Sequence, residues 1–313
     1  MKRVVSVSLG SSERDHRVLT NFLGELFEIE RIGTDASMEK AIDLIRKLEG
    51  EVDAFGMGGI DLYIWAGKKR YTIREAKKLK TAALNTPILD GSGLKNTLER
   101  RVIAYLSKNN IIDFSDKKVL ITSAMDRFGM ADELYSYGAK LVIGDLIFAL
   151  GVGIPLYSLK ALDRVAALIA PIACRLPFNL LYPTGDKQGY NNTTRFSRYY
   201  NGADVIAGDY HYIKKYMPEN MIGKIIITNT VTQKDVEDLR SRGVKLLVTT
   251  TPELEGRSFG TNVMEAMVVA ILRSKGMSEN KENYLTILQE LDFKPRIEYL
   301  NWSLKQGETS AEI

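Results

Sequence analysis

The sequence predicts an α/β protein with two domains, an N-terminal α/β domain and a Rossmann-like domain with a doubly wound parallel sheet. Short apolar runs alternate with amphipathic helical segments, a pattern typical of parallel sheets covered on both faces. The pattern stops in the polar, turn-rich segment 109–117 and starts again after it. The length of 313 residues is also typical of two domains.

The first part of the chain alternates strands and helices. Short or alternating apolar runs predict strands over residues 3–9, 27–32, 52–56 and 86–89. Apolar residues at helical spacing predict helices over residues 37–48, 74–83 and 93–107. The segments that flank Gly67-Lys68-Lys69 predict a hairpin over 62–65 and 71–73. Residues 1–110 are therefore interpreted as an N-terminal domain that binds and converts a substrate.

The second part repeats the alternation with more apolar strands. Strands are predicted over residues 118–122, 140–144, 204–207, 224–228 and 245–249. Helices are predicted over residues 130–137, 159–170, 231–242 and 262–273. Residues 111–275 are interpreted as a Rossmann-like nucleotide-binding domain. Residues 276–313 are interpreted as a C-terminal helical segment that packs back on the body, with a helical pattern over 279–305.

Composition narrows the class of protein. Lys and Arg number 43 against 39 Asp and Glu, and no dense basic tract occurs, so nucleic acid is not an expected partner. One cysteine and two histidines exclude a multi-cysteine or three-histidine metal site, and we expect no metal. The N-terminus lacks the pattern of a signal peptide, and the longest apolar stretch is too short to cross a bilayer. These features predict a cytoplasmic protein without a membrane partner.

Polar residues follow the predicted strands of the second domain, at the edge where ligands of open α/β sheets bind. They are Ser123, Asp145, Asp209, Asn229 and Thr250. Each is also an ordinary turn or helix-cap residue, but together they exceed what capping requires.

The first strand-to-helix turn of this domain occupies the position of a dinucleotide-binding loop. Its glycine is Gly129, and the full glycine fingerprint is missing. Asp145 closes the next strand, where an acid can hold a nicotinamide ribose. We therefore expect NAD as cofactor, bound near Ser123, Gly129 and Asp145, with NADP as the alternative that Arg127 favours.

A turn at Asp90 is the candidate catalytic element. A strand delivers Asp90 into a glycine-flanked turn at a helix start, and Lys95 follows one turn later. An acid and a lysine can form a proton-transfer pair. Lys68 and Lys69 are alternative lysines, and Asp90 could also simply cap the helix.

Two loops are candidate anion-binding segments. The loop after residue 249 opens a helix and offers Arg257, Ser258, Thr261 and Asn262 as donors, unless Thr261 or Asn262 only caps that helix. Residues 181–188, within the irregular segment 175–203, are interpreted as a lid over the cleft. Its candidate contacts are Tyr182 and Lys187.

The order of these parts resembles the shikimate/quinate dehydrogenase family, in which a catalytic α/β domain precedes a Rossmann-like domain. Asn85-Thr86 followed by Asp90-Gly91-Ser92-Gly93-Leu94 is similar to a stretched version of that family's Asn-Thr-Asp-Gly segment. Residues 90–100, 181–188 and 256–266 also resemble bacterial proteins named quinate 5-dehydrogenase, in a resemblance that covers nearly the whole chain. The resemblance implies that Asp90 is the catalytic aspartate. It also implies that Ser11 and Ser12 lie near the position where the family holds a substrate carboxylate.

The main hypothesis is an NAD(P)-dependent oxidoreductase that acts on a hydroxyl of a cyclic polyhydroxy acid in the interdomain cleft. Asp90 and a lysine would handle the hydroxyl proton. The missing glycine fingerprint leaves two alternatives, a non-redox transferase or ligase and a ligand-binding protein on a dehydrogenase-like scaffold. In each case the expected partner is a small anionic metabolite, and a homodimer is one assembly that the sequence allows.

Overall fold

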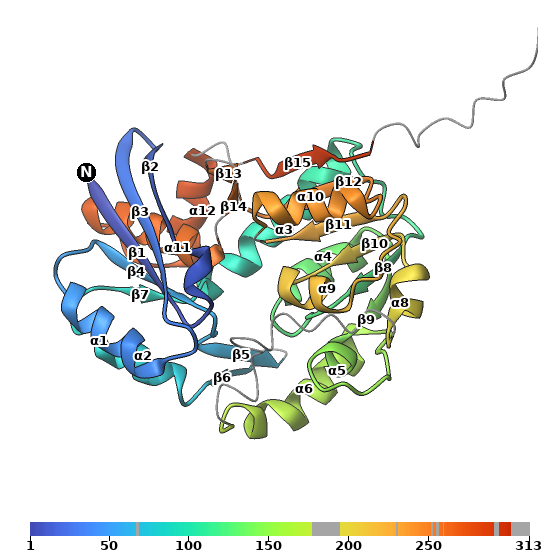
Figure 1. Cartoon of the computed structure of the whole chain (residues 1–313), viewed down its shortest axis with the longest axis horizontal. Helices are drawn as coiled ribbons and strands as arrows, with labels where there is room; N and C mark the ends of the chain where they lie inside the picture. Colours follow the sequence, from blue (N-terminus) through green and yellow to red (C-terminus); the bar gives the residue numbers. More distant parts are fainter. Residues whose placement is uncertain are drawn as a thin grey trace, which may run out of the picture.

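The computed structural model describes residues 1–66, 69–176, 195–229, 231–251, 253–254, 257–258, 260–290 and 294–301. Two large sheets lie side by side, and helices cover both faces of each (Figure 1). This arrangement confirms the predicted two-domain α/β fold. Two short hairpins accompany the sheets, β5 (Tyr63–Ala66) with β6 (Lys69–Thr72) and β13 (Glu253–Leu254) with β14 (Arg257–Ser258).

The first sheet is parallel except at one edge. Its strand order is β2 (His16–Phe22), β3 (Glu25–Gly33), β1 (Lys2–Ser8), β4 (Ala54–Gly58) and β7 (Ile88–Leu89). Only β2 runs antiparallel to its neighbour. The helices α1 (Met38–Leu48) and α2 (Ala76–Ala82) share one apolar core with this sheet. The helices α11 (Thr261–Ser274) and α12 (Lys281–Glu290) share the core on its other face.

The second sheet is also parallel with one antiparallel edge. Its order is β15 (Arg296–Tyr299), β12 (Leu246–Thr249), β11 (Ile225–Thr228), β10 (Val205–Ala207), β8 (Lys118–Ile121) and β9 (Lys140–Ile143). One core contains side chains of α4 (Phe128–Ser136) and the start of α6 (Leu159–Ala173). The opposite core contains side chains of α5 (Asp145–Phe148), α8 (Ser197–Asn201), α9 (Tyr210–Tyr216) and α10 (Gln233–Ser241).

One helix belongs to both halves. In α3 (Ser92–Lys108), Leu94 and Leu98 lie in the core of the first sheet, whereas Val102 and Leu106 lie in the core of the second. The helix runs through the middle of the molecule (Figure 1). Because each end is fixed in a different core, α3 sets the position of one sheet relative to the other.

The C-terminal part of the chain differs from its prediction. The helix predicted over 262–273 was assigned to the second domain, but α11 packs against β1 and β4 of the first sheet. Its apolar residues surround the helix, so it is buried on all sides rather than along one stripe. The helical pattern predicted over 279–305 ends earlier, because α12 stops at Glu290 and β15 joins the second sheet.

The strand order positions the ligand-binding edges. In the first sheet β1 lies between β3 and β4, and in the second β8 lies between β9 and β10. Each is a point where the order of strands reverses, and ligands bind outside the carboxyl ends of strands at such points. Residues that follow β1, β4, β8 and β10 line one common cavity, so the two edges face each other.

Candidate functional site

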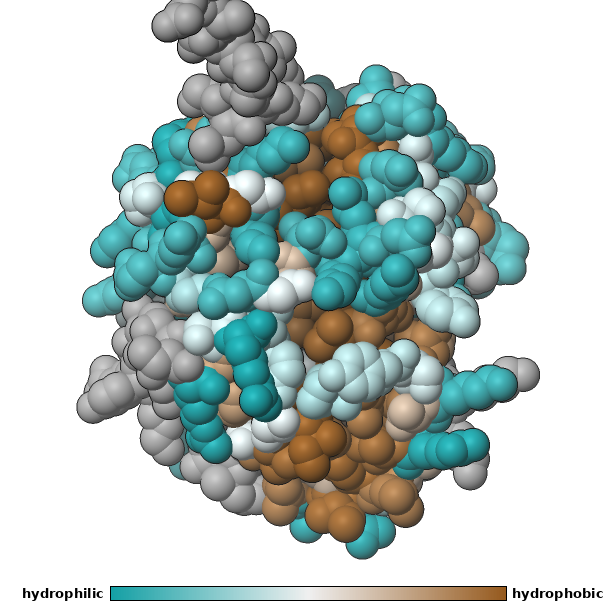
Figure 2. Space-filling model, turned by 90° about the vertical axis from the view of Figure 1, so that its right-hand side faces the viewer, coloured by the Kyte–Doolittle hydropathy of each residue, from teal (hydrophilic) through white to brown (hydrophobic). Residues whose placement is uncertain are grey.

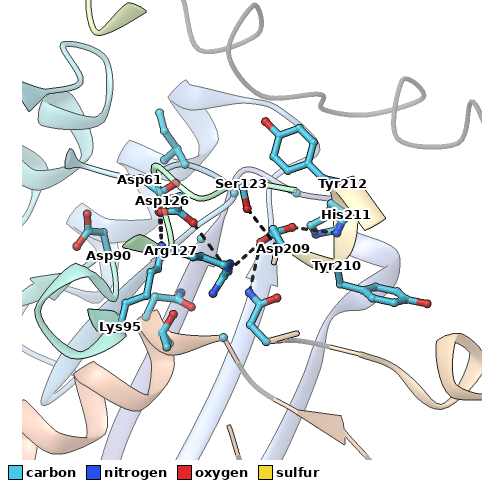
Figure 3. Close-up of a pocket in the computed structure, with 18 of the residues that line it drawn as sticks. Asp61, Asp90, Lys95, Ser123, Asp126, Arg127, Asp209, Tyr210, His211 and Tyr212 are labelled. Carbon is cyan, nitrogen blue, oxygen red and sulfur yellow. Dashed lines mark hydrogen bonds and ion pairs between the residues drawn. The ribbon is translucent and has the colours of Figure 1, made fainter. Parts of the chain in front are cut away.

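The site is a cavity of about 340 Å³ between the two sheets. Ser8 and Gly58 close it from the first sheet, and Thr122 and Asp209 close it from the second. Its volume falls in the range of small-molecule sites, in line with the small-molecule partner that the sequence predicts. The charged side chains of the cavity point toward one another from both halves (Figure 3).

Lys95 joins the two halves of the molecule at the centre of the site. Its Nζ lies 2.5 Å from Asp126 Oδ1 of the second half and 3.2 Å from Asp61 Oδ1 of the first. Burial alone lowers the pKa of Lys95, but the charges of Asp126 and Asp61 outweigh it and raise the pKa above its usual value. Lys95 is therefore a fixed cation, not a base, at neutral pH.

Arg127 is a buried cation beside this group. Its guanidinium forms ion pairs with Glu99 of α3 and with Asp209, the latter at 3.2 Å. Arg127 is 1% exposed and Glu99 is fully buried. Burial opposes the charge of Arg127, but the neighbouring carboxylates raise its pKa above the ordinary value. The pair holds the turn after β8 in place against α3.

Asp209, which follows the end of β10, accepts several hydrogen bonds. Its carboxylate accepts hydrogen bonds from Arg127, from the backbone N–H of His211 at 2.9 Å and from Asn229 Nδ2 at 3.4 Å. Burial raises the pKa of Asp209, but His211 and Arg127 lower it to about 2 overall. Asp209 is therefore ionised at the cavity wall and serves as an acceptor (Figure 3).

A basic corner lies at the other end of the cavity. Arg14 Nη1 of the first half lies 3.0 Å from His211 Nε2 of the second half. Arg31 donates to Asp15 at 2.7 Å and to Ser8 Oγ at 3.1 Å. Burial and the nearby Arg14 lower the pKa of Arg31 to about 10. Burial and the nearby Arg14 lower the pKa of His211, and the charge of Asp209 opposes them.

The opposite wall is apolar. It is built by α5, the residues after it, and one stripe of α6, namely Leu146, Ala149, Leu150, Val165, Ile169 and Ala173. The cavity therefore has one charged wall and one apolar wall.

The predicted catalytic pair does not form. Asp90 lines the cavity, but its carboxylate accepts the backbone N–H groups of Leu62 at 2.8 Å and Ser92 at 3.0 Å. Lys95 pairs with Asp61 and Asp126 instead. Asp90 thus holds the turn before α3 and the backbone at Leu62 in place. Lys69 lies in β6, but its side chain is not among the described parts of the structure. Lys68 lies outside the described residues.

The residues predicted to bind NAD serve mainly structural contacts. Asp145 accepts the backbone N–H groups of Ala124 and Met125, at 2.9 and 2.8 Å, where a ribose would need the carboxylate. Burial raises the pKa of Asp145 to about 6. Gly129 packs against α3 so closely that a Cβ would meet Asn96 Oδ1 at 2.2 Å.

The remaining predicted residues divide between the wall and the interior. Ser123 and Asn229 line the cavity beside Asp209, whereas Thr250 is fully buried behind the strand ends. Binding of NAD or NADP stays a prediction.

The predicted anion-binding residues divide in the same way. Thr261 and Asn262 line the cavity, and Asn262 Nδ2 donates to Ser6 Oγ at 3.0 Å. Ser11 and Ser12 lie beside the cavity, where Ser11 caps the short helix η1 (Ser12–Arg14) and Ser12 N–H donates to Asp35. Four predicted residues lie outside the description: Tyr182 and Lys187 entirely, and Arg257 and Ser258 in their side chains.

Sequence reasoning missed five acids and bases of the cleft: Asp61, Asp126, Arg14, Arg31 and His211. Asp61 and Asp126 follow β4 and β8 by a few residues, which is a usable signal, because parallel strands end at the same edge. Arg14, Arg31 and His211 carry no such signal, since their contact depends on the relative position of the two halves. No group of three potential metal-binding side chains occurs in the described part of the chain. No described helix has the length and apolar character needed to cross a bilayer.

The chain belongs to the family described as "Domain of unknown function (DUF8754)", whose model matches residues 93–300. A second model, "Domain of unknown function (DUF8753)", matches residues 3–90. No curated protein matches the sequence. The resemblance to shikimate/quinate dehydrogenases stays a prediction.

Similar solved structures are distant in sequence. GanP, a glucose-galactose binding protein from Geobacillus stearothermophilus, is 10% identical with a TM-score of 0.40, over 96% of this chain and 97% of that one. The periplasmic binding protein of the arabinose ABC transporter from Shewanella sp. ANA-3 is 11% identical with a TM-score of 0.37, over 92% and 95%. The L-tryptophan dehydrogenase from Nostoc punctiforme is 11% identical with a TM-score of 0.33, over 86% and 67%.

Two predictions are corrected here. The solved structures that resemble this chain are mostly sugar-binding proteins, not the NAD(P)-dependent oxidoreductases that the sequence suggested. The contacts of Asp145 and Gly129 give the physical reason, since both are used inside the protein. The cytoplasmic location expected from the sequence is not that of every similar structure, since they include a periplasmic binding protein.

Proposed function

We propose that the protein binds a small, hydroxyl-rich molecule in the cavity between its two sheets. The observation that carries this proposal is the set of paired acids and bases that line the cleft. Lys95 lies between Asp61 and Asp126, and Arg127 reaches Asp209. A hydroxyl group both donates and accepts, so it can bridge a carboxylate and a neighbouring cation.

Charge balance favours a neutral ligand over an anion. Aspartates and cations line the same wall, and Lys95, Arg127 and Arg31 each contact a carboxylate already. An anion would have to compete with those carboxylates for the cations. Hydroxyl groups can instead join the existing network and replace water in it.

The basic corner supports a second candidate, a ligand that also carries a carboxylate or phosphate. Arg14, Arg31 and His211 meet at one end of the cavity. A sugar acid would place its hydroxyls on the aspartates and its anionic group on Arg14. This candidate retains the small anionic metabolite predicted from the sequence.

Calorimetric titration separates the two candidates. The full chain is titrated with neutral monosaccharides and cyclitols, and with glucuronate and gluconate as acidic counterparts. We expect saturable 1:1 binding of at least one neutral compound. Tighter binding of the acids, lost in Arg14→Met, would select the second candidate instead. Absence of binding by every compound would refute both.

Two variants place the binding in the cavity. Asp209→Asn replaces a charged acceptor, and hydrogen bonds to charged groups contribute about 1.5–3 kcal/mol, so we expect affinity to fall at least about tenfold. Asp238→Asn is the matched control, because Asp238 bonds Arg242 on α10 and does not line the cavity. Equal effects of the two variants would argue against the cavity as the binding site.

A further inference from the structure

One stripe of α6 faces the cavity instead of a protein core. The helix buries Leu162, Ala166 and Ala170 along its inner side. Val165, Ile169 and Ala173 follow one another at four-residue spacing, are only half-buried, and line the cavity. Eight residues of helix span about 12 Å, which is longer than a single pyranose ring.

This stripe is held in place from both halves of the molecule. In sequence the helix lies between β9 and β10 of the second sheet, yet it packs against β5 of the first half. The backbone N–H of Arg74 donates to the carbonyl oxygen of Cys174 at 3.0 Å, just after the helix. The apolar stripe is therefore fixed to the first half of the molecule as well as to the second.

The apolar wall reaches the outer surface. Leu150 lines the cavity and is 54% exposed. Ile154, which precedes α6, is 59% exposed, and Leu168 on α6 is 75% exposed. Figure 2 shows apolar residues gathered on the lower part of one face, the part formed by α5 and α6 in Figure 1. An apolar group inside the cavity could therefore extend toward this surface.

A ligand made of hydroxyls alone would leave this wall in contact with water. Burying apolar surface contributes about 25 cal/mol per Å² of area removed from water. A ligand that leaves this wall in water therefore loses that contribution to its binding free energy. Small-molecule sites commonly combine apolar walls with a few converging polar groups.

We propose that the ligand is amphipathic, with a hydroxyl-rich head on the charged strand ends and a hydrocarbon or aromatic group along Val165, Ile169 and Ala173. This inference rests on the proposed function and specifies its substrate class. The head binds where Asp126, Arg127 and Asp209 meet. The apolar group runs along α6 toward Leu150 and the surface.

The test is a chain-length series measured by calorimetry on the full chain. The probes are D-glucose and methyl, hexyl and octyl β-D-glucoside, the last two below their micellar concentrations. A buried methylene contributes about 0.8 kcal/mol, close to fourfold in affinity. We expect hexyl glucoside to bind at least about tenfold more tightly than methyl glucoside.

Substitutions on α6 assign the gain to the stripe. Ile169→Gln should remove most of the difference between the hexyl and methyl compounds, and Val165→Thr should reduce it in a variant of nearly unchanged shape. Leu168→Gln is the matched control, because Leu168 is the next residue on the same helix but points to solvent and does not line the cavity. Thermal unfolding of each variant confirms that the fold is retained.

The outcomes separate this inference from the proposed function. If glucose and all glucosides bind equally, the head site is real and the amphipathic ligand is refuted. If affinity grows with chain length but is unchanged in Asp209→Asn, the charged wall is not the head site and the proposed function fails. If Leu168→Gln acts like Ile169→Gln, the chain lies on the outer surface and the inference fails. If no probe binds, both proposals fail for glucosides.

Discussion

Arg127 is the residue on which the site is assembled. It connects α3, the turn after β8 and the end of β10 through Glu99 and Asp209. A buried ion pair contributes little compared with a well-packed apolar pair, but removing one partner leaves an uncompensated buried charge. The sequence identified Arg127 as a cofactor contact, whereas its observed role is to fix the carboxylates of the cavity.

Replacing Arg127 should therefore cost much of the stability. We expect Arg127→Met to lower the free energy of unfolding by about 3–5 kcal/mol, measured by urea denaturation. Arg100→Met is the control, because Arg100 pairs with Asp132 and Glu133 while remaining 31% exposed. That variant should lose about 1 kcal/mol or less. Similar losses in both variants would contradict the role assigned to Arg127.

Glu265 should make the free energy of unfolding depend on pH. It is buried beside Asp90, and Tyr284 donates to its Oε1 at 3.1 Å. Burial and the charge of Asp90 raise the pKa of Glu265 to about 8, so the folded protein keeps a proton that the unfolded chain releases near pH 4.5. The stabilisation from this proton is complete below pH 4.5 and is lost as the pH rises through 8.

Glu265→Gln should remove that part of the pH dependence. We expect the free energy of unfolding of the native chain to fall more steeply between pH 5 and 8.5 than that of Glu265→Gln. Glu290→Gln, which changes an exposed carboxylate that pairs with Lys275, should retain the native slope. Parallel curves for the native chain and Glu265→Gln would show that Glu265 is ionised throughout this range.

At the scale of elements, local capping explains why several helices are predictable. Thr232 caps α10, and the Asp235 carboxylate accepts the backbone N–H of Thr232, which completes a capping box. Thr232→Ala should lower the free energy of unfolding by about 1 kcal/mol, and Thr232→Ser should restore most of it. Thermal or urea unfolding measures the stability of each variant. Equal stability of the alanine and serine variants would exclude a capping contribution.

Elements that depend on distant partners are harder to predict. The helix over 37–48 begins after its Ser37 cap, and the strand over 118–122 is an apolar run, so both appear close to their predicted limits. The edge strand β15 has only four residues and no local signal in the sequence. It forms because it pairs with the exposed edge of β12. The sequence pattern cannot show such an edge.

The same limit applies to the candidate site. Ser123, Asp145 and Asn229 were found because strands end next to them. Their contacts could not be found in that way: Asp145 bonds to neighbouring backbone groups, and Lys95 pairs with Asp61 and Asp126 across the molecule. Side-chain pairing of this kind depends on how the two sheets are placed, which no local pattern records.

At the scale of the whole molecule, shared elements hold the two sheets around one cavity. Helix α3 has one end in each core, α11 returns to the first sheet, and α6 contacts the hairpin of the first half. Arg14 and His211 add a contact between the halves at the basic corner. A ligand in the cavity would contact both halves at once and should therefore reduce their relative motion.

Amide hydrogen exchange with and without ligand tests the central claim most directly. The full chain is labelled in the absence and presence of the neutral sugar or glucoside that binds most tightly. The account predicts slower exchange in peptides from both sheets, covering 58–62, 122–127 and 208–213, with little change in α10. Slower exchange confined to one half, or none at saturating ligand, would contradict binding between the two sheets.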